Sequence, residues 1–337
     1  MSKQCLELNP DNLIVGSASF ISQWESNLKF VTNDICCKNI AKYIFGLQVN
    51  DIEDVKNKDD YSGFLEIILT NEKMAYLYEH LNENIYNLLI NQYLIVKNIN
   101  GEVVDKLKWT GTTYTSLTIK NINSSYFGTI KPYKGDIYQQ CILDSFITNQ
   151  VTMVKGNAGT GKSYLALGYL FYLLEKQNID KIVIFTNTQP TANSAKLGFY
   201  PGTRTEKLLE SNIGNMLSSK LGDCFMVEKM IQEGKILLLP MCDIRGYDTS
   251  GMHCGVYITE AQNMDISLMK LALQRIGEDC VCIIDGDYNT QVDLKQYAGF
   301  NNGMRRMSEV FRGQNFYGEV ELQNIYRSKI AAIAELM

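Results

Sequence analysis

One eight-residue segment, residues 156–163, limits the fold of this 337-residue chain more than any other feature. It reads Gly156-Asn157-Ala158-Gly159-Thr160-Gly161-Lys162-Ser163 and fits Gly-x-x-x-x-Gly-Lys-[Ser/Thr] at every specified position. An apolar run, Val151–Lys155, precedes the segment, and a helical pattern over Lys162–Glu175 follows it. Glycines in such a strand–loop–helix unit let backbone N–H groups converge on phosphates where side chains would clash. The segment therefore predicts a P-loop.

The motif also predicts how a ligand is held. The backbone that faces the phosphates belongs to Gly156, Asn157, Ala158, Gly159, Thr160 and Gly161. The N-terminus of the following helix adds positive potential. Lys162 should reach the β- and γ-phosphates, and the Ser163 hydroxyl should bind magnesium. We therefore expect ATP, or another purine nucleoside triphosphate, with Mg²⁺; the alternative is a purely structural glycine-rich turn.

Beyond residue 128 the pattern is that of an α/β domain. Short apolar runs, separated by helical stretches, occur at Val151–Lys155, Lys181–Thr186, Ile236–Leu239, Val256–Thr259 and Val281–Asp285. Such runs are typical of a parallel sheet that helices cover on both faces. We expect residues 129–337 to form a doubly wound, mostly parallel P-loop NTPase sheet.

The first 128 residues have a different organisation. In residues 1–60 we expect helices at Leu13–Ile21 and Asn33–Gly46, a short strand at Lys29–Thr32, and a polar loop or boundary at Asp51–Asp60. In residues 61–128 we expect a helix at Glu72–Asn82, strands at Phe64–Leu69, Gln92–Val96, Val103–Leu107 and Thr112–Thr118, and a hairpin at Asn100-Gly101. The sequence thus predicts a small N-terminal α/β segment followed by a β-rich connecting region.

The charge, the cysteines and the apolar runs of the chain indicate its binding partners and its cellular compartment. The net charge of −5 argues against a molecule that is basic overall, although a local basic groove is compatible with it. Nine cysteines without a repeated Cys-x-x-Cys spacing argue against a zinc site and a disulfide framework, and favour a reducing cytosol. The longest apolar run, about Tyr164–Leu174, is too short to cross a bilayer. We expect a cytoplasmic protein with no membrane partner.

A carboxylate that could drive hydrolysis follows the run Gly255–Ile258. This is the position of a Walker B element, and Glu260 would polarise the attacking water. The magnesium-binding Asp usual at the preceding position is Thr259 here, whose hydroxyl can hold a coordinated water but carries no charge. Magnesium should therefore bind more weakly than at a full Walker B site, and Thr259→Asp should strengthen its binding. Ser163, Thr259 and Glu260 make up the predicted metal site. The alternative is an ordinary surface glutamate after a core strand.

A second polar cluster follows the next apolar run. Asp285-Gly286-Asp287 ends that run, and Gln291 lies four residues further on. Polar groups at the carboxyl ends of parallel strands face the ligand crevice. We interpret Asp287 or Gln291 as a sensor of the γ-phosphate; a helix cap is the alternative for Asp287.

These motifs have a family resemblance when they are taken in order. The P-loop, then Lys196–Gly202, then Ile258–Asn263, and then Asp285–Asp287 resemble the PhoH family, in particular PhoH-like proteins carried by bacteriophages, over about Gly128–Met337. The resemblance implies a RecA/helicase-like, cytosolic P-loop ATPase related to superfamily-one helicases. Some members act on RNA and some are tied to phosphate starvation. The resemblance implies a bacterial cell as the setting, and for the phage-carried proteins a cell infected by phage.

The resemblance also implies roles for single residues. Gln139 stands where superfamily-one enzymes place a Gln that reads the adenine edge, and Leu322–Ser328 resembles their Arg motif through Arg327. Arg275 is a second candidate for an arginine that completes the site, in cis or from a neighbouring subunit. We favour a homo-oligomer, by resemblance a hexameric ring, with the arginine acting in trans; ordinary surface ion pairs are the alternative. Besides Thr259, the chain departs from the family in lacking an Arg within Thr186–Pro190.

The N-terminal segment is similar to the second half of a PIN ribonuclease domain around Asp11 and Asp34. A PIN nuclease needs four acids around its metals, and the stretch that carries the other two is missing before Asp11. We therefore predict a degenerate PIN-like segment without nuclease activity. An unrelated α/β cap is the alternative.

Several functions remain open from sequence alone. The leading hypothesis is an ATPase, or RNA helicase, that acts on RNA or single-stranded nucleic acid through a groove of basic and stacking side chains. Candidates for that groove are Lys196, Phe199, Tyr200, Arg204 and Lys207. The alternatives are a nucleotide-dependent regulatory scaffold with a protein partner, a PIN-type nuclease, and a P-loop kinase for a small molecule.

Overall fold

The computed structural model describes residues 9–25, 27–32, 34–50, 61–118, 120–186, 212–222, 224–288 and 299–326. By its internal contacts the chain divides into two units, Met1–Asp60 and Tyr61–Met337. The helices within these described ranges include none that is both long and apolar enough to span a membrane.

The described residues of the first unit form α-helical and π-helical segments and a two-stranded parallel sheet. Its elements are α1 (Pro10–Ile21), β1 (Phe30–Val31), α2 (Ile35–Asn39), the π-helix η2 (Ile40–Ile44) and β2 (Val49–Asn50). Helix α1 begins where it does because Pro10 occupies its first turn and the Asn9 side chain accepts a hydrogen bond from the Asn12 N–H at 2.8 Å. The predicted helix at 33–46 is thus divided, its second half being π-helical.

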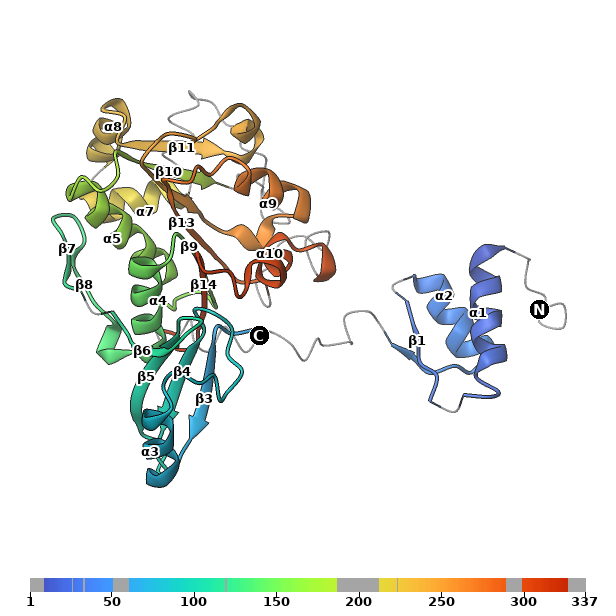
Figure 1. The fold of residues 1–337 in the computed structure, drawn as a ribbon. Helices are drawn as coiled ribbons and strands as arrows, with labels where there is room; N and C mark the ends of the chain where they lie inside the picture. Colours follow the sequence, from blue (N-terminus) through green and yellow to red (C-terminus); the bar gives the residue numbers. More distant parts are fainter. Residues whose placement is uncertain are drawn as a thin grey trace. The chain divides into compact units, whose positions relative to one another are not determined.

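The second unit is built on a six-stranded sheet in which every strand pairing is parallel (Figure 1). The strands are β9 (Val151–Gly156), β10 (Lys181–Thr186), β11 (Ile236–Pro240), β12 (Cys254–Ile258), β13 (Val281–Gly286) and β14 (Tyr317–Leu322). Their order is β11-β10-β12-β13-β9-β14, so β13 lies between the P-loop strand β9 and β12. The predicted doubly wound α/β sheet is confirmed.

Helices cover both faces of this sheet, with a separate apolar core on each (Figure 1). One face holds α4 (Ile137–Thr148), α5 (Lys162–Glu175), α7 (Asn212–Leu221) and α8 (Cys224–Gln232). The other face holds the 3₁₀ segment η6 (Met241–Gly246), α9 (Ile266–Leu273) and α10 (Gly303–Phe311). The hairpin of β7 (Ile122–Ser124) and β8 (Gly128–Ile130) packs on α5, where a Cβ on Gly168 would lie 2.5 Å from Ile130. The glycine that interrupts the apolar run is therefore a packing residue.

A smaller four-stranded sheet occupies the predicted connecting region. It contains β3 (Phe64–Ile68), β4 (Tyr93–Lys97), β5 (Val103–Trp109) and β6 (Tyr114–Ser116), in that order, with α3 (Asn71–Glu79) between β3 and β4. The pair β3–β4 is parallel, whereas β4, β5 and β6 are antiparallel, and the turn at Gly101 (φ +82°) makes the predicted hairpin. Leu77, Leu94 and Trp109 belong to its own buried core.

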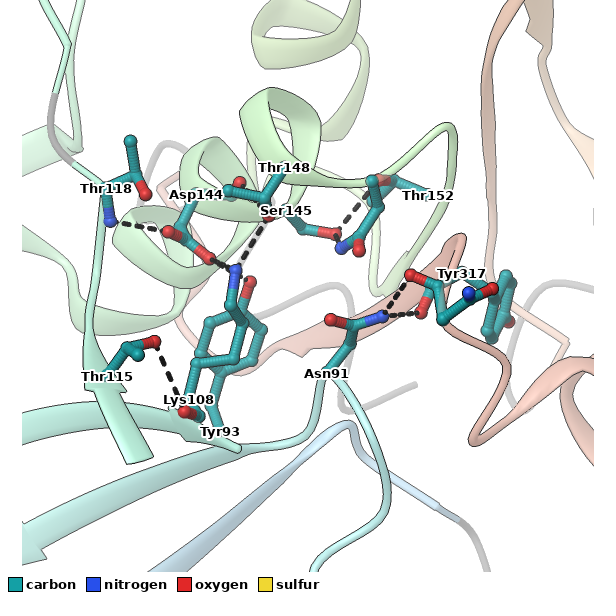
Figure 2. Close-up of polar contacts among 12 residues, drawn as sticks. Asn91, Tyr93, Lys108, Thr115, Thr118, Asp144, Ser145, Thr148, Thr152 and Tyr317 are labelled. Atoms are coloured by element: carbon teal, nitrogen blue, oxygen red, sulfur yellow. Dashed lines mark hydrogen bonds and ion pairs between the residues drawn. The ribbon is translucent and has the colours of Figure 1, made fainter. Parts of the chain in front are cut away.

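Strand β5 is joined to helix α4 by charged side chains (Figure 2). The Lys108 Nζ lies 2.8 Å from Asp144 Oδ2, and the Tyr93 hydroxyl donates to the same oxygen at 2.8 Å. Two residues before Lys108, the Lys106 Nζ donates to Gln140 Oε1 at 3.0 Å. A two-residue step along a strand is about 6.6 Å and a four-residue step along a helix about 6 Å, so the two pairs match in spacing.

We expect Lys108→Met to lower the free energy of unfolding by about 3–5 kcal/mol, because it leaves the carboxylate of Asp144 buried without its cation. The side chains of Lys108 and Asp144 are 7% and 0% exposed, so solvent does little to offset the loss. Lys106→Met is the matched control and should change stability by less than about 1 kcal/mol, because its partner is a neutral amide. Urea unfolding of the full chain measures both. Equal losses would show that the buried pair adds nothing specific.

Candidate nucleotide-binding site

The P-loop connects the end of β9 to the start of α5, as the motif predicts. Gly156, Gly159 and Gly161 have φ angles of +137°, +83° and +92°, a region that favours glycine. A Cβ on Gly156 would also lie 2.6 Å from the carbonyl oxygen of Leu322 in β14. The loop therefore depends on glycine both for its backbone angles and for its packing.

Lys162 and Ser163, the last two residues of the motif, both turn toward the loop and the strand ends. The Lys162 Nζ donates to the carbonyl oxygens of Gly156 and Asn157 at 2.5 and 2.9 Å. The Ser163 hydroxyl donates to Asp285 Oδ2 at 2.9 Å. Phosphate oxygens are stronger acceptors than carbonyls because they are charged, so the lysine is poised to exchange its partners for a polyphosphate.

Helix α4 braces the P-loop through Gln139, whose side chain is buried. Its Nε2 donates to the carbonyl of Thr160 at 2.9 Å, and its Oε1 accepts from the Tyr133 N–H at 2.7 Å. Both ends of the amide are thus engaged, one of them with the loop itself. That Gln139 also reads adenine stays a prediction.

A second brace comes from the segment that follows β14. The Tyr326 N–H donates to the carbonyl of Gly159 at 2.9 Å, and its ring lies 4.5 Å from the ring of Tyr133. The Tyr326 hydroxyl donates to Asp136 Oδ2, while Asp136 Oδ1 caps α4 by accepting from the N–H groups of Tyr138 and Gln139. Burial and the Asp136 carboxylate raise the pKa of Tyr326 to about 12, so the hydroxyl remains a donor at neutral pH. Arg327, which follows, lies outside the described residues.

Sequence reasoning missed this aromatic pair. Neither tyrosine carries a periodic signal: Tyr133 lies six positions before Gln139, and Tyr326 directly precedes Arg327. Only the pairing of β14 with β9 brings the two segments together at the P-loop.

Glu260 lies just past the end of β12 with a left-handed backbone, φ 53° and ψ 39°. Its carboxylate accepts from Gln262 Nε2 at 2.6 Å, and Gln262 Oε1 accepts from the Asp287 N–H at 3.2 Å. A side chain larger than glycine at such angles is strained by about 1 kcal/mol or more, and residues of this kind cluster at functional sites. Gln262, buried and absent from the predicted site, ties the two predicted residues together.

We expect Glu260→Gly to be more stable than Glu260→Ala by about 1 kcal/mol, because only glycine relieves the left-handed backbone. Both changes remove the carboxylate and its bond to Gln262, so their difference isolates the backbone. Thermal unfolding of the two variants tests this. An alanine variant as stable as the glycine variant would show that position 260 is not strained.

Asp287 is buried near the same strand ends and is 4% exposed. The residue before it must be small, because a Cβ on Gly286 would lie 2.6 Å from Gln262 Oε1 and 2.9 Å from the Gln262 nitrogen. This close approach explains the glycine between two aspartates. Whether Asp287 senses the γ-phosphate stays a prediction, and Gln291 lies outside the described residues.

Asp285 is a residue that sequence reasoning passed over as part of a polar cluster. Besides the Ser163 hydroxyl, it accepts from the Tyr257 hydroxyl at 2.7 Å and from the Glu260 N–H at 3.2 Å. The Tyr257 hydroxyl also interacts with the hydroxyls of Ser163 and Thr259. Burial, together with the Asp285 carboxylate, raises the pKa of Tyr257 well above its usual value, so the tyrosine donates. The one sequence signal that could have pointed to Asp285 is a carboxylate within an apolar strand.

Arg275 lies near the amino ends of the strands. Its carbonyl accepts from the N–H and hydroxyl of Thr249, and Gly277 packs on the same threonine. Thr249 precedes the amino end of β12, whereas the P-loop lies at the carboxyl ends of the strands. The structure does not bring Arg275 to the P-loop of its own chain, and an action in trans stays a prediction. The groove candidates at 196–207 lie outside the described residues.

Asp11 and Asp34, the two acids of the predicted PIN-like match, are exposed. Asp34 caps α2, accepting from the Cys37 N–H at 2.7 Å, and Asp11 lies in the first turn of α1. Neither these acids nor any others in the described part of the chain gather with His, Cys, Asp or Glu into a group of three or more that could hold a metal. The predicted lack of nuclease activity stays a prediction.

The parallel six-stranded sheet, the glycine-rich loop between β9 and α5, and the polar strand ends beside it define a P-loop NTPase fold. A model of the family described as PhoH-like protein matches residues 130–336, and the chain belongs to that family. Members of this class bind nucleotides through the P-loop.

Three relatives show the range of similarity. The chain is 26% identical over 216 residues to a PhoH-like protein of Mycobacterium tuberculosis, which covers 62% of this chain and 57% of that protein. It is 25% identical over 352 residues to Protein PhoH2 of Bacillus subtilis, covering 98% of this chain and 78% of that protein. With Protein PhoH of Escherichia coli the identity is 30% over 173 residues, covering 50% and 47%. The chain thus spans little more than half the length of the mycobacterial relative.

Among solved structures, C. elegans PCH-2 matches 72% of this chain and 57% of that chain at 12% identity, with a TM-score of 0.25. A similarity this low carries no argument.

Proposed function

We propose that this chain is a magnesium-dependent ATPase whose turnover responds to RNA or single-stranded nucleic acid. The observation that carries the ATPase part is the position of Asp285, which accepts from the Ser163 hydroxyl and from the Glu260 backbone. These bonds bring the P-loop and Glu260, the candidate for activating water, into one site.

The residues divide the chemistry between them. Lys162 neutralises charge on the phosphates, and the N–H groups at the start of α5 bind them. Glu260 orients the attacking water and accepts its proton, while Gln262 fixes the carboxylate of Glu260. Magnesium, when bound with the nucleotide, neutralises charge on the phosphate oxygens. Ser163 and Asp285 provide oxygen ligands of the kind that magnesium prefers.

The nucleic-acid part rests on the resemblance of the ordered motifs to superfamily-one helicases. A homo-oligomer, by the same resemblance a hexameric ring with Arg327 or Arg275 acting in trans, belongs to the proposal, as does a cytoplasmic location. Light scattering of the purified chain measures the assembly mass.

The deciding experiment is ATP turnover with and without RNA and single-stranded DNA, at low and high salt. Stimulation by either nucleic acid that weakens with salt supports the proposal, because contacts to phosphates release counterions. Turnover that neither nucleic acid changes would favour a nucleotide-dependent scaffold with a protein partner. No turnover under any condition would overturn the ATPase assignment.

A further inference from the structure

The carboxylate beside the P-loop hydroxyl comes from β13, and not from β12, where a Walker B aspartate is expected. Asp285 Oδ2 lies 2.9 Å from Ser163 Oγ, and the aspartate is 2% exposed. At the expected position stands Thr259, 7% exposed, which carries no charge.

The register of the sheet explains why the two positions are equivalent. Strands β12 and β13 are parallel neighbours with Ile258 paired to Ile284, so Thr259 and Asp285 come next on each strand. Paired residues on parallel neighbours point to the same face, and the strands lie about 4.8 Å apart. A side chain at 285 can therefore reach the surroundings of Ser163 that a side chain at 259 would reach.

We propose that Asp285 supplies the magnesium-site carboxylate of this chain, in place of the residue at position 259. This inference rests on the proposed ATPase function. Magnesium at nucleotide sites is held by one or two carboxylates, a hydroxyl and phosphate oxygens, and it needs no cage of protein ligands. Asp285 and Ser163 provide the carboxylate and the hydroxyl at hydrogen-bonding distance of one another.

Three donors hold the side chain of Asp285 in place. It receives hydrogen bonds from the hydroxyls of Ser163 and Tyr257 and from the Glu260 N–H, which compensate for lost hydration. The same bonds hold the carboxylate in a fixed direction, toward the P-loop.

The proposal reverses an expectation drawn from sequence. With position 259 considered alone, magnesium should bind weakly and Thr259→Asp should strengthen it. With Asp285 as the ligand, Thr259→Asp alone places two carboxylates on adjacent strands, where like charges oppose one another. We expect no gain from that change, a loss from Asp285→Thr, and a recovery when the two are combined so that the carboxylate moves back to β12.

The experiment measures the affinity of the full chain for a fluorescent ATP analogue, in Mg²⁺ and in EDTA. For Asp285→Asn we expect the tightening by Mg²⁺ to fall by about 10-fold or more, a range typical for loss of a metal-site partner. In EDTA the affinity should stay equal or rise, because a negative charge near the phosphates has been removed. Asp180→Asn, an exposed aspartate before the amino end of β10, is the matched control and should leave both values unchanged.

A weaker effect of Mg²⁺ on affinity, together with an equal or higher affinity in EDTA, distinguishes a metal ligand from a structural support. If Asp285→Asn weakens binding equally in Mg²⁺ and EDTA, or leaves the effect of Mg²⁺ unchanged, the proposal is overturned. Recovery of the Mg²⁺ effect in Thr259→Asp/Asp285→Thr supports it, provided that thermal unfolding shows both variants folded, and failure of that folded double variant to recover counts against it. A wild-type chain that binds the analogue in neither solution would overturn the proposed function as well, an outcome that the variants alone cannot mimic.

Discussion

Lys162→Ala should reduce ATP turnover by at least about 100-fold, the effect of removing one fixed group that stabilises developing charge. The side chain lies within the loop, with its Nζ bonded to two P-loop carbonyls. The Nζ thus already lies where it would contact the oxygens of a polyphosphate bound in the loop. Affinity for ATP should also fall, because a charge-assisted bond to phosphate is lost. Turnover by the purified variant at saturating ATP measures the effect.

The control is Lys176→Ala, at the C-terminal end of the same helix α5. Lys176 is exposed, so its loss should change neither turnover nor stability appreciably. If Lys162→Ala kept turnover within about three-fold of wild type, the P-loop would not be the hydrolytic site, because a catalytic charge is worth far more than that.

Glu260→Gln should leave ATP bound and slow turnover by about 10²–10⁴-fold, because an amide cannot take the proton of the attacking water. The change preserves size and can still accept the bond from Gln262. Binding should therefore stay within about three-fold while the rate falls, a pattern that marks a group acting only in the transition state. Single-turnover hydrolysis and analogue binding, measured on one preparation, separate the two quantities.

Glu278→Gln is the matched control, since Glu278 is an exposed glutamate shortly before the amino end of β13, whereas Glu260 follows the carboxyl end of β12. It should hydrolyse ATP at the wild-type rate. Equal rates for Glu260→Gln and wild type would leave Glu260 as a strained turn residue without a catalytic role. A Glu260→Gln variant that no longer binds ATP would place the residue in binding instead.

The local sequence was sufficient where short-range chemistry decides the structure. The P-loop follows from glycine angles and one helix N-terminus, and all its members lie within eight residues. Helix α5 and strand β10 have the predicted bounds, because an unbroken apolar run and a helical pattern define them. The predicted helix at 33–46 was less accurate, since its second half is a π-helix, a form that the periodicity does not distinguish.

The sequence by itself therefore determined the fold class, the phosphate loop and the identity of Glu260 as a residue after a buried strand. Only the tertiary structure placed Asp285 against Ser163, 122 positions apart, because strand order puts β13 between β9 and β12. It also decided that Gln139 and Tyr326 brace the loop and that Arg275 lies near the amino ends of the strands, away from the P-loop. Each of these contacts depends on which strands are neighbours, and no local pattern encodes the order of strands in a parallel sheet.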